Sequence, residues 1–160
     1  MSVGHFHIPG DATKREYAVY IMVATNRGTG QKKVYVGKTG DNREGCNPVI
    51  SRAGNHLSFN PVHSQMRNLW EPGQPQDYDF DFFYTTFGCY VAPEKSRDGI
   101  SLVNEMERQL NRMAATAFGA LLLNPYRGKG RAGPPSIATE ERTAALSSLI
   151  EHVRAFLEKP

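Results

Sequence analysis

Apolar and polar side chains alternate along residues 17–37, which predicts a β-hairpin. Tyr17 and the apolar residues at every second position after it would share one face of a strand, with Tyr20 on the other face. The polar, Gly-rich segment 26–33 predicts the loop, and Tyr35 lies between valines in the returning strand. Gly37 predicts the end of that strand, because a backbone turns or is approached closely where a side chain is missing.

A second alternating segment, at residues 77–91, predicts a third strand. Its aromatic residues at every second position from Tyr78 to Tyr84 would line one face. The opposite face carries Asp79 and Asp81, which admit two interpretations. A solvated strand surface is the ordinary one, and a metal-binding pair is the alternative.

Helical periodicity covers much of the remaining chain. It predicts helices at 49–57, 62–70, 101–119 and 139–157. Asp98 or Ser101 would cap the long third helix, and Gly119 would end it. The predicted fold is therefore α/β in the α+β sense: a small, mainly antiparallel three-stranded sheet flanked by helices.

Composition adds modest constraints. The 160 residues suggest one domain, 1–160, with a lead-in at 1–15 and a C-terminal helix within 138–160. A net charge of +3 favours a polyanionic partner only slightly. No apolar stretch approaches the ~20 residues of a membrane span, and the N-terminus lacks the apolar core of a signal peptide. Cys46 and Cys89 indicate neither a zinc site nor a disulfide framework, so we expect a protein of the reducing cytoplasm. Because no segment could span a membrane, we expect no membrane partner.

Two tripeptides on the predicted hairpin, Ala18-Val19-Tyr20 and Tyr35-Val36-Gly37, precede an Arg52-Ala-Gly-Asn-His56 segment. This order resembles the GIY-YIG nuclease family, including a lysine, Lys38, directly after the second motif. The first motif departs from the family because alanine replaces its glycine. The resemblance implies a GIY-YIG-like fold and a DNA endonuclease, an enzyme that hydrolyses phosphodiester bonds.

The resemblance also implies catalytic roles for these side chains. Hydrolysis requires a base for the attacking water and positive charge at the phosphate. Tyr20 would be the general base with Tyr35 assisting, Arg52 would clamp the phosphate, and His56 would accept a proton from Tyr20. A phenol of pKa ~10 can do this only if its pKa is lowered or a proton acceptor is supplied. Without the resemblance, each of the four is an ordinary strand aromatic or helix-face residue.

A metal-binding carboxylate is the fifth part of the pattern, with Mg²⁺ (or Mn²⁺) as the implied cofactor. Glu105 and Glu107 both lie on the long predicted helix. Helical spacing aligns Glu107 with the apolar stripe, whereas it predicts that Glu105 projects towards solvent with Arg108 and Arg112. Glu107 is therefore the predicted metal ligand, and Glu105 is the alternative.

Supporting residues are less specific. Gly37 and Lys38 belong to the second motif, and Asn124 resembles the late asparagine of the family, although an asparagine before a proline is also typical of a turn. A basic, Gly-rich segment could follow a DNA backbone or be a plain surface linker. It carries Arg127, Lys129 and Arg131.

A compact member of the family resembles a type II restriction endonuclease acting on double-stranded DNA. A double-strand cut would require a homodimer on DNA, or two successive visits. Three alternatives remain open: a structure-specific nuclease, a nuclease toxin, and a DNA-binding module that does not cleave.

Overall fold

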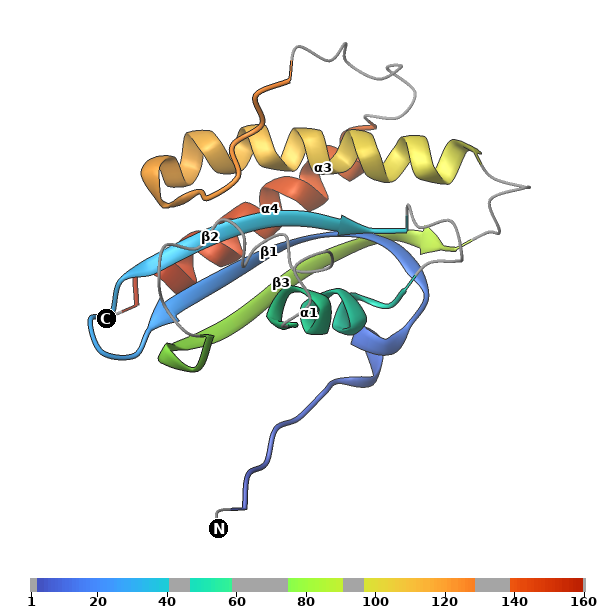
Figure 1. Ribbon diagram of the computed structural model, residues 1–160. Helices are drawn as coiled ribbons and strands as arrows, with labels where there is room; N and C mark the ends of the chain where they lie inside the picture. Colours follow the sequence, from blue (N-terminus) through green and yellow to red (C-terminus); the bar gives the residue numbers. More distant parts are fainter. Residues whose placement is uncertain (1–2, 41–46, 59–74, 91–96, 129–138, 160) are drawn as a thin grey trace.

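Three antiparallel strands form one sheet in the order β2-β1-β3 (Figure 1). They are β1 (Glu16–Asn26), β2 (Lys32–Thr39) and β3 (Tyr78–Cys89). The computed structural model describes residues 3–40, 47–58, 75–90, 97–128 and 139–159. Within them the fold is α+β, which confirms the predicted fold class, and the predicted third strand pairs with β1.

Helices cover both faces of the sheet. The long helix α3 (Arg97–Phe118) and α4 (Glu140–Leu157) pack on one face, and the short helix α1 (Val49–Leu57) lies on the other (Figure 1). Three single-turn 3₁₀ helices complete the described elements: η1 (Gly10–Thr13), η2 (Pro75–Asp77) and η4 (Gly119–Leu121).

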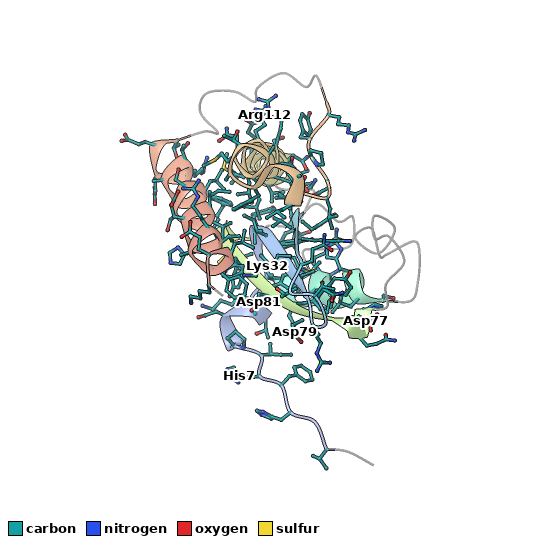
Figure 2. The ribbon with its side chains drawn as sticks, turned by 90° about the vertical axis from the view of Figure 1, so that its left-hand side faces the viewer. His7, Lys32, Asp77, Asp79, Asp81 and Arg112 are labelled. Atoms are coloured by element: carbon teal, nitrogen blue, oxygen red, sulfur yellow. The ribbon has the colours of Figure 1, made fainter. Side chains whose placement is uncertain are left out.

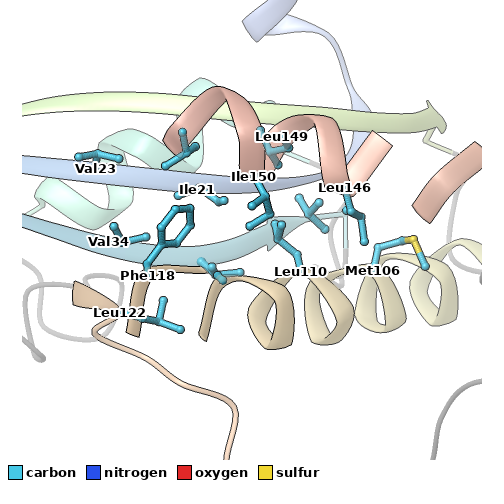
Figure 3. Close-up of a cluster of buried hydrophobic side chains, with 14 of the residues drawn as sticks. Ile21, Val23, Val34, Met106, Leu110, Phe118, Leu122, Leu146, Leu149 and Ile150 are labelled. Carbon is cyan, nitrogen blue, oxygen red and sulfur yellow. The ribbon is translucent and has the colours of Figure 1, made fainter. Parts of the chain in front are cut away.

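The alternation along β1 divides the core in two. Val19, Ile21 and Val23 contact α3 and α4, whereas Tyr20 and Met22 join the aromatic side of β3. Both assignments confirm the prediction from period-2 spacing. Figure 3 shows the larger cluster, in which the apolar stripes of both helices meet the sheet.

The C-terminal helix completes this core. Thr139 caps it by accepting a hydrogen bond from the backbone N–H of Arg142. At its other end, Lys32 Nζ donates to the carbonyl oxygens of Leu157 and Lys159, each at 2.9 Å. The apolar stripe of α4 therefore packs within the chain.

Two predicted boundaries were wrong. β2 continues past Gly37 to Thr39, because residues 37–39 still pair with β1. The helix α3 begins at Arg97, so Asp98 and Ser101 lie within it and do not cap it. Gly119 does end α3, with a positive φ of 53° that glycine adopts at little cost.

Other predictions fall partly outside the described residues. The predicted helix at 62–70 lies wholly outside them. The lead-in is described from Val3, which is fully exposed, and the segment extends away from the sheet in Figure 1. None of the described helices combines the length and apolar character needed to cross a membrane.

Leu146→Ala should lower the free energy of unfolding by about 2–5 kcal/mol, because Leu146 is fully buried between α4 and the sheet. The exposed neighbour offers a control: Ser147→Ala should change it by no more than about 0.5 kcal/mol. Urea unfolding at several protein concentrations measures both. A wild-type midpoint that rises with concentration would instead mean that α4 is stabilised by self-association.

Candidate active site

Tyr20 lies at the centre of the sheet, directly opposite Gly37 on β2 and Tyr84 on β3. Its side chain is fully buried. A Cβ atom at Gly37 would collide with the Cζ and Oη atoms of Tyr20, so the phenol ring lies across the glycine. The missing side chain therefore lets the hydroxyl of Tyr20 reach over β2, which is an edge strand.

Helix α1 brings Arg52 and His56 to the same side of the sheet. It begins after Pro48, and its one-turn spacing places both residues on one face, as predicted. The Tyr20 hydroxyl and His56 Nε2 are 2.5 Å apart. The ring of Tyr35 packs edge-on against the imidazole, with 4.8 Å between ring centroids. The structure therefore brings together the four side chains that the sequence motifs singled out.

Burial keeps the two phenols and the imidazole of this cluster neutral. Desolvation raises the pKa of Tyr20 well above its usual value, although Arg52 opposes the shift through its charge and a hydrogen bond. Desolvation, with the Glu107 carboxylate adding to it, raises the pKa of Tyr35 to about 12. Burial, with the Arg52 charge adding to it, lowers the pKa of His56 to about 4.

These shifts keep the phenol and the imidazole neutral at neutral pH. When the imidazole carries its proton on Nδ1, the Tyr20 hydroxyl donates to His56 Nε2, and this is the arrangement in which His56 can accept a proton. Arg52 lowers the pKa of Tyr20, but burial outweighs this effect. The proton acceptor required for a phenol to act as a base is in place.

Glu107 approaches the cluster around the edge of β2. Its Oε2 atom lies 2.5 Å from Lys38 Nζ, and the carboxylate is near enough to raise the pKa of both Tyr20 and Tyr35. Its side chain is 29% exposed. Helical spacing therefore predicted correctly that Glu107 faces the sheet.

The prediction for Glu105 was wrong. Both of its oxygens are bound by the Arg108 guanidinium, with 2.8 Å between Nε and Oε2, and Gln109 Nε2 donates to Oε1 at 2.9 Å. Glu105 and Arg108 are both buried. An arginine one turn away neutralises the carboxylate, so it packs against the protein instead of projecting to solvent. Both oxygens of Glu105 are therefore already paired within the helix. Of Glu105, Arg108 and Arg112, which were predicted to face solvent together, only Arg112 is exposed.

Asn124 holds the chain after α3 against β2. Its side chain accepts a hydrogen bond from the Val36 N–H at 3.0 Å and donates to the Val36 carbonyl at 2.7 Å. Asn111 ties the same segment to α3, because its side chain donates to the Asn124 carbonyl and accepts from the Tyr126 N–H. Sequence reasoning missed Asn111, although it lies one turn after Glu107 on α3.

The remaining predicted binding residues are less constrained. Arg127 is exposed at the end of this segment, whereas Lys129 and Arg131 lie outside the described residues. Figure 2 shows Asp79 and Asp81 on β3, away from Arg112 on α3. The Asp79 carboxylate lies 3.9 Å from Arg27, and both aspartates are at least partly exposed, as expected for a solvated face.

Metal chemistry at the cluster would depend on one carboxylate. No group of three histidine, cysteine or acidic side chains gathers to hold an ion within the described ranges. A partly exposed carboxylate suits Mg²⁺ or Mn²⁺ nonetheless, because these ions are held by one or two carboxylates together with waters and substrate oxygens. Glu107 fits that description.

Two described pockets lie elsewhere, between β3 and α4, with volumes of about 350 and 320 Å³. Residues of β3 and α4 line both pockets, with Phe83 in the first and Phe87 in the second, and both phenylalanines pack on the opposite side of the sheet from Tyr20. The pockets hold none of the predicted catalytic side chains. The cluster of predicted catalytic side chains therefore lies apart from both pockets.

Comparison of the chain with protein-family models, curated proteins and solved structures found no match. The GIY-YIG resemblance accordingly rests on the residues quoted above.

Gly37→Ala and Gly54→Ala should change stability in opposite directions. At Gly37 the added methyl displaces the Tyr20 ring, which should cost about 1–3 kcal/mol. At Gly54, on α1, no atom of the described residues beyond its chain neighbours and its own helix backbone lies within 4 Å of the added carbon, so the helix should gain about 0.5–1 kcal/mol. Denaturant unfolding compares them. Equal effects would show that Tyr20 does not lie across Gly37.

Acidification should destabilise the protein through His56. Because folding lowers its pKa from 6.5 to about 4, the unfolded chain binds the proton more readily, and stability is lost as the pH falls through this range. The contribution is about 3 kcal/mol by pH 4. His56→Gln should remove this part of the pH dependence, whereas a change at the exposed His152 should not. Unfolding curves between pH 7 and 4 provide the measurement.

Proposed function

We propose that the chain is a metal-dependent DNA endonuclease that hydrolyses phosphodiester bonds. The observation that carries the proposal is the contact between the Tyr20 hydroxyl and His56, with Arg52, Tyr35 and Glu107 around it. A protein that only binds DNA has no need of a buried hydroxyl next to a neutral imidazole. The resemblance to GIY-YIG nucleases supports the same activity from the order of these residues.

The geometry supports a proton relay. An attacking water would give its proton to the Tyr20 oxygen as Tyr20 passes its own to His56 Nε2, so the step needs no free tyrosinate, which the raised pKa of Tyr20 disfavours. Arg52 would fork two N–H groups onto the phosphate. Once Arg52 is paired with the phosphate charge, it would lower the pKa of His56 less. His56 would therefore be a better proton acceptor when substrate is bound.

Glu107 would hold the divalent ion beside the same phosphate. When bound, the ion would supply positive charge for the phosphate oxygens and the leaving oxygen. Tyr35 assists by packing against His56 and fixing the imidazole ring. Asn124 supports the site from behind, by fixing the edge of β2 that carries Tyr35 and Gly37.

The finer proposal is a type II restriction enzyme that acts on double-stranded DNA in the cytoplasm, with two chains on one site. Incubation with plasmid and genomic DNA, with and without Mg²⁺ or Mn²⁺, tests it. Discrete fragments from both substrates support sequence-specific cleavage. Cleavage restricted to branched DNA would replace the restriction role with a structure-specific one. Binding without any cleavage, with metal present, would overturn the endonuclease proposal.

Tyr20→Phe should lower the single-turnover cleavage rate by about 10²–10⁴-fold, because it deletes the hydroxyl of the relay and keeps the ring. It leaves His56 Nε2 without its donor, so a stability loss of about 1–3 kcal/mol should accompany it. Tyr84→Phe, opposite Tyr20 on β3, is the matched control and should cut at the wild-type rate. A Tyr20→Phe enzyme as fast as this control would exclude the relay.

A further inference from the structure

The ion pair between Lys38 and Glu107 suggests how the proposed site is controlled. Lys38 has the same parity on β2 as Val34 and Val36, so it faces α3, while Tyr35 and Gly37 face α1. Its Nζ atom lies 2.5 Å from Glu107 Oε2. The carboxylate best placed to hold a divalent ion is therefore already neutralised by a cation of the chain itself.

We infer that Lys38 is an internal counter-ion of Glu107, and that DNA phosphate and the divalent ion bind cooperatively because both require this ion pair to open. The inference rests on the proposed endonuclease function. It concerns the order and coupling of binding, which the proposed reaction leaves open.

Electrostatics favour an exchange of partners. A divalent ion at Glu107 would stand close to the Lys38 ammonium, so like-charge repulsion weakens metal binding while the ion pair is closed. A DNA phosphate offers Lys38 another anion, and the lysine has a flexible four-carbon stem with which to reach it. The two side chains are 19% and 29% exposed, so both partners of the exchange can approach them.

Thermodynamic linkage makes the effect reciprocal. If a bound phosphate draws Lys38 away and tightens metal binding by some factor, the metal tightens phosphate binding by the same factor. Binding at one coupled site usually changes the affinity of the other by roughly 5- to 150-fold. The ion pair would thus keep the affinity for the metal low until DNA is bound, so the ion would bind mainly to the complex with DNA.

Mn²⁺ binding to the intact protein tests this by calorimetry and by electron paramagnetic resonance, which read binding without activity. Lys38→Met should bind Mn²⁺ about tenfold more tightly than wild type in the absence of DNA. Lys38→Arg keeps the charge and should stay near wild type. Lys14→Met is the matched control, because it also removes a lysine paired with a carboxylate, at 2.6 Å from Asp11, in the exposed lead-in.

The second arm adds a random-sequence phosphorothioate duplex. It should tighten Mn²⁺ binding to wild type about tenfold and to Lys38→Met hardly at all. If Glu107→Gln abolishes Mn²⁺ binding but Lys38→Met binds no tighter than Lys14→Met, the counter-ion role is wrong and the proposed metal site stands. If no protein binds Mn²⁺ in a Glu107-dependent way, with or without duplex, the metal site of the proposed function falls as well.

Discussion

The buried contact between the Tyr20 hydroxyl and His56 determines most of what this site can do. A phenol and an imidazole in an apolar setting are both held neutral, because desolvation penalises either charged form. The hydrogen bond is therefore formed between neutral groups, with the proton on tyrosine. The absence of a side chain at Gly37 is the constraint that permits this contact, since the ring occupies the space of its Cβ.

The sheet was predictable because its signals are local. Strict alternation assigned the two faces of β1, and aromatic residues at every second position assigned those of β3. The helix carrying Arg52 and His56 was predicted with its observed bounds. Gly37 was misread as a strand end, because a glycine within a strand looks the same in sequence whether the chain turns there or a ring lies across it.

The contacts between elements could not be predicted, because they depend on partners distant in the sequence. Helical spacing placed Glu107 towards the sheet, but not against Lys38. The same spacing misplaced Glu105, since it ignores the arginine one turn away that allows a carboxylate to be buried. The two hydrogen bonds between the Asn124 side chain and the Val36 backbone fix the chain after α3 against β2, a contact that the sequence, with a turn as an equal alternative, did not indicate.

The central claim is that His56 is a neutral acceptor for the Tyr20 proton, and ¹⁵N NMR of the imidazole measures this directly. Between pH 8 and 4, wild-type His56 should keep its proton on Nδ1 and titrate with a pKa of about 4. In Tyr20→Phe the Nε2 resonance should shift, because its hydrogen-bond donor is gone. A wild-type His56 that titrates near 6.5, with an Nε2 resonance unaffected by Tyr20→Phe, would contradict the account.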